Sequence, residues 1–461
     1  MSADEYGTVI RSGVSRSGLA FSEACRPFDE IDVGQYRRDS RETEVRTRTM
    51  AENRRRGRGS SVAKRLALVL VASGLALTAC TSSSNPDVGG SIGSTTVLPS
   101  KPSTGAPISV GYISPEGGAT GQVPEAREAA QAAVQYINSN LGGVQGRPVN
   151  LVVCKEKEDP ATARDCANQL VAANVVAVVA PVTSQGDAMV PIITGAGIPF
   201  VTGLGASSTE MTSNGAFVLS AGVPGGLAVV AKYAVQQKYK KVALVGVDAG
   251  AVMAGLKVIA GPVFQQSGVQ LQTIGIPIGT PDATPQISAA LEGNPDAITI
   301  LGDGPLCTSV LKALQTLGSK ADKLLFQLCV SPDVISAVGT AAAGAHVLGY
   351  SDVTSEDAEA VLYRTVMSKY APNTAVGGTA YMGYQTTLGL YRSIAGLQGD
   401  VTAAAAMGAM NQATNVDLPV GHGLTFTCGG KTQPLLKAIC GSGAIITTLK
   451  DGKPVDPQVF K

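Results

Sequence analysis

The stretch Val175-Val176-Ala177-Val178-Val179-Ala180 is a continuous run of apolar residues, most of them β-branched. Such a run is typical of a parallel strand covered on both faces, since a strand with one wet face alternates apolar and polar residues. Pro181-Val182-Thr183-Ser184 follows directly and ends the predicted strand. The stretch therefore predicts a parallel β-sheet with helices packed on both sides.

Strands and helices alternate on either side of this run. Residues 108–113 alternate like a strand, and the apolar residues of 125–140 recur at helical spacing. The alternation resumes beyond residue 225, so we expect two α/β units that are joined near this position. Further strands are predicted at 149–153, 199–201, 242–247, 271–276, 297–301 and 324–328, and further helices at 163–173 and 186–196.

The composition excludes several classes of function. A net charge of +1 with 15% charged residues argues against a nucleic-acid partner and against a polybasic membrane-binding surface. Glycine contributes 55 of 461 residues, which suits tight turns and backbone that lines a ligand site. The chain has two histidines and no paired-carboxylate motif, so we expect no enzyme and no cofactor.

A secretory signal precedes the α/β region. Basic residues between Arg54 and Arg65 lead into an apolar run, 66–77, that is too short to span a bilayer. The run ends in Leu77-Thr78-Ala79-Cys80, which resembles a bacterial lipobox, in which the cysteine is lipidated. We expect residues 50–79 to be a lipoprotein signal peptide and Cys80 to anchor the exported protein to the outer face of the cell membrane. The alternative is an ordinary signal peptide with a chance cysteine.

Two further segments flank this signal. Residues 1–49 are polar and arginine-rich, and Met50 would give a signal of ordinary length. We therefore expect residues 1–49 to lie upstream of the true start or to be disordered. Residues 80–106 are rich in Ser, Thr, Gly and Pro, which predicts a flexible tether behind the lipidated cysteine.

Six cysteines follow Cys80 and fall into three sequential pairs. Several connectivities are possible, and local pairing is the simplest arrangement in an exported chain. A metal site is the weaker interpretation, because the chain has no Cys-x-x-Cys and only His346 and His422 as imidazoles. The expected disulfides are Cys154–Cys166, Cys307–Cys329 and Cys428–Cys440.

Several stretches, in this order along the chain, together resemble one known family. They are Tyr136-Ile137-Asn138 with 142–147, Val178 to Ser184, 197–202 with Glu210-Met211-Thr212, Gly383-Tyr384, 423–426 and 450–453. The chain resembles the type I solute-binding proteins of ABC importers, especially the leucine/isoleucine/valine-binding branch. This resemblance covers roughly residues 107–455.

The resemblance implies a type I periplasmic binding protein fold. That α/β fold has two Rossmann-like lobes with parallel sheets, joined by three crossover segments, and binds its ligand between the lobes. Lobe one would be 107–225 with 348–422, and lobe two 226–347 with 423–461. The implied partners are a small-molecule solute and an ABC permease, and we expect a monomer. All three disulfides would lie within a lobe, the first in lobe one and the other two in lobe two.

Candidate ligand-binding residues in lobe one follow two neighbouring predicted strands. Ligands of such folds lie beyond the carboxyl ends of parallel strands, where N–H groups at helix N-termini receive a carboxylate. Ser184 follows the strand 175–180, and Gly205 and Ser207 take the equivalent place after the next strand. The alternative for each is an ordinary helix cap or turn residue.

Lobe two departs from the pattern of the amino-acid binders. Ala249-Gly250-Ala251-Val252-Met253 stands where the family often has an aromatic residue, and Asp303 stands where a tyrosine would follow Gly302. Cys329-Val330-Ser331 occupies the place of the carboxylate for a ligand ammonium. Asp248 or Asp303 would substitute for that carboxylate, or each is a solvated turn or helix cap. The solute class therefore stays open between an amino acid and an amide-like compound.

The sequence thus predicts an extracytoplasmic, lipid-anchored protein that captures a small polar solute for an ABC importer. The alternative is a lipoprotein of the same fold that senses a ligand or binds a partner without a role in transport.

Overall fold

The computed structural model describes residues 95–118, 122–248, 251–433 and 435–461. Cys80, the signal 50–79, the segment 1–49 and residues 81–94 of the expected tether lie outside the described residues. Within the described ranges, no helix is both long enough and apolar enough to span a bilayer.

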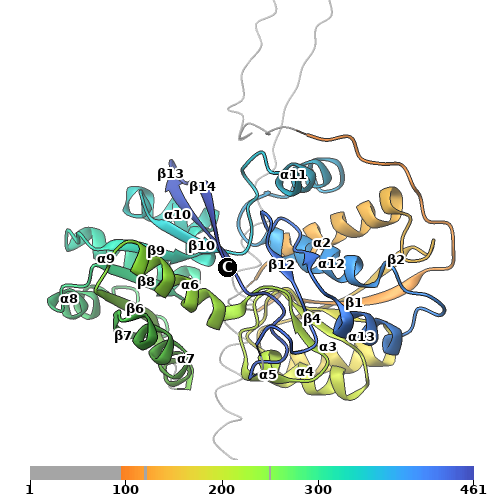
Figure 1. The fold of residues 1–461 in the computed structure, drawn as a ribbon, viewed down its shortest axis with the longest axis horizontal. Helices are drawn as coiled ribbons and strands as arrows, with labels where there is room; N and C mark the ends of the chain where they lie inside the picture. The colour runs from red at the N-terminus through yellow and green to blue at the C-terminus, as the bar shows by residue number, and fades with distance from the viewer. Residues whose placement is uncertain (1–94, 119–121, 249–250, 434) are drawn as a thin grey trace, which may run out of the picture. The chain divides into compact units, whose positions relative to one another are not determined.

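The first sheet is parallel throughout and has the strand order β2-β1-β3-β4-β5 (Figure 1). The predicted run 175–180 lies at its centre and is fully buried, with its residues divided between the cores on the two faces. The prediction of a strand covered on both faces is therefore confirmed. The strands are β1 Ile108–Pro115, β2 Val149–Glu156, β3 Val178–Val179, β4 Phe200–Thr202 and β5 Ala216–Val218.

Helices from distant parts of the chain cover this sheet. One face carries α2 Pro124–Tyr136, its π-helical continuation η1 Ile137–Leu141, α11 Ala358–Tyr370 and α12 Ala380–Ile394. The other face carries α3 Pro160–Ala172 and α4 Gly186–Gly195. Helices α2 and α12 approach so closely that a Cβ on Gly383 would lie 1.7 Å from the carbonyl oxygen of Ala126. Only glycine fits at this crossing. The shorter elements of this lobe are α5 Ser208–Thr212, α13 Ala403–Gln412, β11 Val416–Asp417 and β12 Thr425–Phe426.

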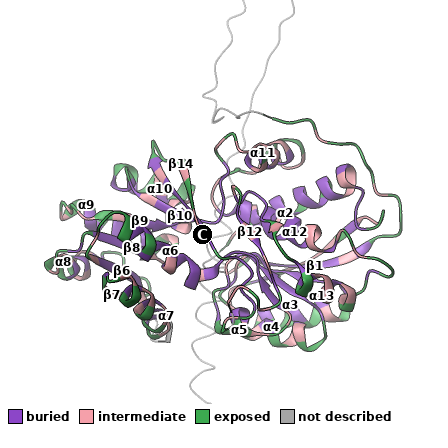
Figure 2. Ribbon diagram, in the orientation of Figure 1, coloured by how far each residue is buried: buried purple, intermediate pink, exposed green. Residues whose placement is uncertain are grey.

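The second sheet has the order β14-β13-β10-β9-β8-β6-β7. Its last five strands in this order are parallel, as predicted, whereas β13 and β14 add an antiparallel edge that the sequence reading did not anticipate. Figure 2 shows buried residues along the inner strands of both sheets, whereas the edge strands β14 and β7 of the second sheet are mostly exposed or half-buried. The elements are α6 Gly222–Gln236, β6 Lys241–Asp248, α7 Ala251–Ser267, β7 Gln270–Pro277, α8 Thr284–Glu292, β8 Ala297–Leu301, α9 Gly304–Thr316, β9 Asp322–Phe326, η2 Gln327–Val330, α10 Pro332–Val338, η3 Gly339–Ala342, β10 His346–Gly349, β13 Ala444–Lys450 and β14 Lys453–Phe460.

The chain passes between the two sheets three times, which agrees with the predicted fold class. The crossovers follow β5, β10 and the segment that ends at Cys440. We call the first sheet with its helices lobe one and the second sheet with its helices lobe two.

The segment 423–440 belongs to lobe one, so its expected place in lobe two is wrong. The N–H of Val218 donates to Ala438 O at 2.8 Å, and the N–H of Cys440 donates to Val218 O at 2.8 Å. Strand β5 is an edge strand, and this segment satisfies backbone groups of the edge that would otherwise have no partner.

The structure contains the three expected disulfides. Cys154–Cys166 joins β2 to α3, and Cys307–Cys329 joins α9 to η2. Cys428–Cys440 lies beside β5 in lobe one, not in lobe two as expected. None of the three bridges connects the two lobes.

Part of the predicted tether packs on lobe one. The N–H of Thr96 donates to Thr365 Oγ1 at 3.0 Å, and the side-chain amide of Asn140 donates to Pro99 O at 2.6 Å. The N–H of Ser103 donates to Asn138 O at 2.8 Å. The expectation of a flexible tether as far as residue 106 is therefore wrong for residues 96–103.

Candidate functional site

The loops after β2 and β3 meet at the carboxyl edge of the first sheet. Glu158 lies between β2 and α3, and Ser184 lies between β3 and α4. The N–H of Ser184 donates to Glu158 Oε2 at 3.1 Å, and the Ser184 hydroxyl donates to the same oxygen. Ser184 thus binds a carboxylate, but it is a carboxylate of this chain. Its role toward a solute stays a prediction.

Gln185 holds this pair in place. Its side-chain amide donates to the carbonyl oxygen of Glu158 at 3.1 Å and to the Ser184 hydroxyl oxygen at 2.8 Å. A serine hydroxyl has one hydrogen to donate. The Ser184 hydroxyl therefore donates to Glu158 and accepts from Gln185, and it has no further donor to offer.

Glu156 is a fully buried carboxyl group beneath Glu158. Its Oε2 accepts the N–H of Glu158, and the Thr183 hydroxyl lies 3.5 Å from its Oε1. Burial raises the pKa of Glu156 to about 7, and the charge of Glu158 adds to this effect. The polar contacts thus continue from the sheet interior out to Ser184.

A third carboxylate, Glu116, follows β1 at the same edge. Arg127 Nε donates to it at 2.6 Å, Lys155 Nζ lies 2.7 Å from it, and the Ser114 hydroxyl donates to it at 2.9 Å. Burial disfavours its charge, but these donors outweigh burial and lower the pKa of Glu116. Arg127 and Lys155 are therefore both engaged by Glu116.

Sequence reasoning missed Glu116, Glu156 and Glu158. Each of them comes at or directly after the carboxyl end of β1 or β2. Their position could have identified them from the sequence, because polar side chains at the carboxyl ends of parallel strands share one edge of the sheet.

Ser207 and Gly205 have clear structural roles. Ser207 is the N-cap of α5, where its hydroxyl accepts from the N–H of Glu210 at 3.2 Å and its own N–H donates to Glu210 Oε2 at 2.8 Å. Gly205 has φ +66°, and a Cβ there would lie 2.8 Å from the Val218 side chain. In the structure Ser207 is thus a helix cap and Gly205 a turn residue, which is the alternative that the sequence left open.

Ser207 nevertheless lies close to the loop of Ser184. A Cβ on Gly186, the first residue of α4, would come within 2.4 Å of Ser207 Oγ. The N–H of Thr209 donates to Asp187 Oδ1 at 3.1 Å and also connects α5 with α4. The N-termini of both helices therefore lie side by side at this edge.

In lobe two, Asp248 is the last residue of β6, and Asp303 follows the neighbouring strand β8. Both side chains are exposed. Asp303 is the N-cap of α9 and accepts from the N–H of Leu306 at 3.0 Å. Asp248 packs its Cβ against Gly275. Among the described residues, no hydrogen bond joins Asp248 or Asp303 to the lobe-one candidates Ser184 and Ser207.

The crossover segments are held by buried polar contacts. The Gln385 side-chain amide donates to Tyr350 O at 2.9 Å and to Pro419 O at 2.8 Å. Asp352, which is buried, lies 2.8 Å from His422 Nδ1.

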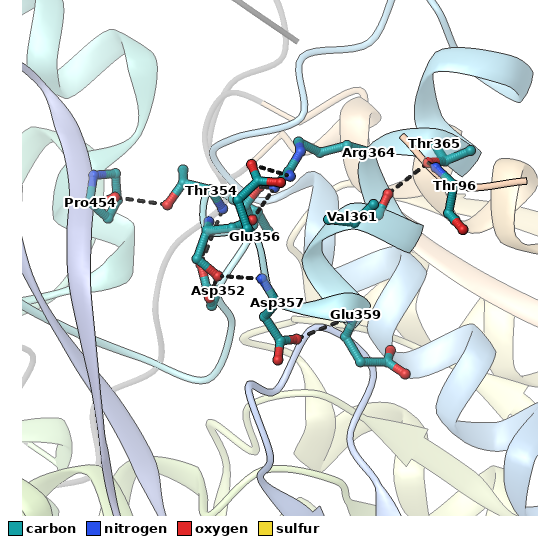
Figure 3. A network of polar contacts seen from close by, with 12 residues as sticks. Thr96, Asp352, Thr354, Glu356, Asp357, Glu359, Val361, Arg364, Thr365 and Pro454 are labelled. Carbon is teal, nitrogen blue, oxygen red and sulfur yellow. Dashed lines mark hydrogen bonds and ion pairs between the residues drawn. The ribbon is translucent and has the colours of Figure 1, made fainter. Parts of the chain in front are cut away.

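Figure 3 shows how the crossover after β10 continues into α11. Arg364 donates to Val353 O at 3.0 Å and to Ser355 O at 2.7 Å. The Thr354 hydroxyl donates to Pro454 O of lobe two at 2.8 Å. This crossover is thus bonded to both lobes.

One cavity of lobe one lies away from these residues. It has a volume of about 420 Å³, borders Met407 and Lys437 and lies at the amino end of β5. It is therefore at the opposite end of the strand from the candidate residues. In the described part of the chain, no group of three or more His, Cys, Asp or Glu residues is arranged to hold a metal ion.

Residues 107–436 match the sequence profile of the family described as Periplasmic binding protein. The match spans more than half of the 461 residues, so the chain belongs to this family. The predicted resemblance to type I solute-binding proteins is thereby confirmed. No curated protein sequence matches the chain.

Solved structures of ABC transporter solute-binding proteins share the fold. A possible leucine/isoleucine/valine-binding protein from Rhodopirellula baltica is 15% identical with a TM-score of 0.66, over 78% of this chain and 98% of that one. A solute-binding protein from R. palustris in complex with 4-hydroxybenzoate is 19% identical with a TM-score of 0.64, over 77% and 97%. A branched-chain amino acid transporter substrate-binding protein from Streptococcus pneumoniae in complex with isoleucine is 17% identical with a TM-score of 0.63, over 77% and 99%.

Proposed function

We propose that the protein captures a small polar solute between its lobes and presents it to an ABC permease. The observation that supports this most directly is the arrangement of polar groups at the carboxyl edges of both sheets. In lobe one these are Ser184 and the neighbouring N-termini of α4 and α5, and in lobe two they are Asp248 and Asp303. Ligands of open α/β sheets bind beyond such edges.

Three crossovers would let the lobes close around the solute. Lobe one would bind the solute first, at the sheet edge that carries Ser184, Gly205 and Ser207, and lobe two would follow with Asp248 and Asp303. A solute held between the lobes selects the closed state, because only that state satisfies both sets of polar groups.

We also propose that the protein is exported and held at the outer face of the cell membrane by a lipid on Cys80. The support is the basic stretch, the short apolar run and the cysteine that ends it. An anchored protein keeps its captured solute near the permease.

The ligands of the related structures do not identify the solute of this protein. Isoleucine and 4-hydroxybenzoate, found in two related structures, are both carboxylates but otherwise differ in chemistry. The fold therefore serves several solutes, and the site must settle which one binds. For this chain we propose a polar, amide- or hydroxyl-bearing solute.

A thermal-shift screen of amino acids, amides, polyols and sugars tests the proposal. A true solute raises the melting temperature, because it binds the folded state alone. Small-angle scattering should then show compaction of the protein with that solute. Binding without compaction would contradict closure of the lobes.

A further inference from the structure

The loop directly before α4 already holds a carboxylate. Ser184 directs its N–H and its hydroxyl at one oxygen of Glu158, and the second Glu158 oxygen lies 3.5 Å from the same N–H. A backbone N–H and a hydroxyl that converge on one point in this way would also receive a free carboxylate. We infer that Glu158 is a specificity-determining residue that occupies the carboxylate position at Ser184, so that lobe one accepts a solute that donates hydrogen bonds and excludes one that presents a carboxylate there. The inference rests on the proposed function, since it concerns the same site.

Glu158 is held in this place from three sides. Its N–H donates to the buried Glu156, its carbonyl oxygen accepts from Gln185, and its side chain accepts from Ser184. Its φ is +57°, in the left-handed region that a glutamate seldom adopts. Such a conformation persists only when surrounding contacts hold it, so the Glu158 carboxylate is a fixed part of the site.

The charges around Ser184 oppose a second carboxylate. Glu158 contacts Ser184 directly, and Glu116 lies at the end of β1 along the same sheet edge. The cations Arg127 and Lys155 are engaged by Glu116. A carboxylate brought to Ser184 would meet Glu158 with neither of these cations free to balance it.

The Glu158 carboxylate can also bind a solute that donates hydrogen bonds. Glu158 is partly exposed, and an ionised carboxylate has about four lone-pair positions, of which Ser184 uses one oxygen. A hydroxyl, an amide N–H or an ammonium group of the solute would donate to the remaining positions. Charge-assisted hydrogen bonds of this kind are stronger than neutral ones.

The first test uses acetate as the probe and needs no knowledge of the solute. In Glu158→Ala the position at Ser184 is vacated, and acetate should bind there, raise the melting temperature and shift the amide resonance of Ser184. Chloride at equal ionic strength should do neither. Wild type should not respond to acetate, and neither should Asp165→Ala, which removes an exposed carboxylate of α3. If Glu158→Ala does not fold, Glu158→Gly replaces it, because glycine adopts the φ of +57° without strain and also vacates the position, so the expected acetate effect is the same.

An unchanged Ser184 resonance in the variant, or an equal acetate effect in wild type, would overturn the inference.

The second test compares acids with their primary amides, for example L-leucine with L-leucinamide, by calorimetry. The ratio of the affinity for the acid to the affinity for the amide should be at least about tenfold higher in Glu158→Ala than in wild type. Tight binding of the acid by wild type, with compaction and no gain in the variant, would refute the role of Glu158 while supporting solute capture.

Discussion

The hydroxyl of Tyr350 donates to the carbonyl oxygen of Gly222 at 2.5 Å and so joins two of the three crossovers. Tyr350 follows β10, whereas Gly222 begins α6 directly after the first crossover. The tyrosine is buried, and a Cβ on Gly226 would lie 2.8 Å from its hydroxyl oxygen. This bond therefore lies where the lobes are expected to hinge.

Tyr350→Phe should destabilise the protein and alter closure. It removes one buried hydrogen bond, at a cost of about 0.5–1.5 kcal/mol. Chemical denaturation measures this loss. Tyr363→Phe is the matched control, because Tyr363 donates to Val376 O at 2.9 Å within lobe one. Only Tyr350→Phe should change the solute-induced compaction in scattering, and an equal effect of both variants would refute a hinge role for Tyr350.

Asp303 should serve both α9 and the solute, and two substitutions separate these roles. Asp303→Ala removes the N-cap and should cost about 1 kcal/mol of stability. It should also weaken solute binding by more than about tenfold, because a charge-assisted hydrogen bond is lost. Asp303→Asn keeps a capping oxygen, so it should retain stability but lose affinity in calorimetry. Full affinity in both variants would remove Asp303 from the site.

Glu210 should make the protein more stable in mild acid. Burial raises the pKa of Glu210 from 4.5 to about 7, so the folded state keeps a proton that the unfolded state releases. The stability from this group is fully present below the unfolded pKa and is lost as the pH rises through about 7. The loss is at most about 3–4 kcal/mol, at about 1.4 kcal/mol per pKa unit.

Glu210→Gln provides the test of this pH effect. The amide keeps an oxygen for the N–H groups of Ala206 and Ser207 but does not ionise. The difference in unfolding free energy between about pH 5 and about pH 8 should therefore shrink in the variant. Glu156 has a pKa raised in the same direction and should keep part of the effect. An unchanged pH difference would show that Glu210 does not titrate as described.

The three disulfides should be detectable and stabilising. Non-reduced peptide mapping should recover Cys154–Cys166, Cys307–Cys329 and Cys428–Cys440. Replacing both cysteines of one pair by serine should cost about 3 kcal/mol in denaturant unfolding, because the closed loop limits the unfolded chain. Free thiols at these positions, or links between the lobes, would contradict the assignment.

Cys80→Ser should release the protein from membranes into the medium. The reason is the loss of the lipid-accepting thiol that ends the signal. Fractionation and detection of the protein in both fractions measure the effect, with Cys154→Ser as the control that should stay membrane-bound. Unchanged membrane retention of Cys80→Ser would argue against the lipid anchor.

The sequence by itself determined the elements and their class. The run 175–180 predicted a doubly covered parallel strand, because burial on both faces demands apolar residues at every position. The alternation of strands and helices predicted two parallel α/β sheets, and the spacing of the cysteines predicted the bridges. These are local patterns, and residues near in the chain suffice to create them.

The tertiary structure alone decided which distant groups meet. Glu158 and Ser184 belong to loops after β2 and β3, which β1 separates in the sheet, and the left-handed backbone of Glu158 turns its carboxylate to the serine. The segment up to Cys440 joins lobe one because the edge strand β5 has unpaired backbone groups. No periodicity in the sequence encodes an edge or a left-handed residue. Both contacts form only in the packed chain, where a polar group that lacks a partner meets a residue far away in the sequence.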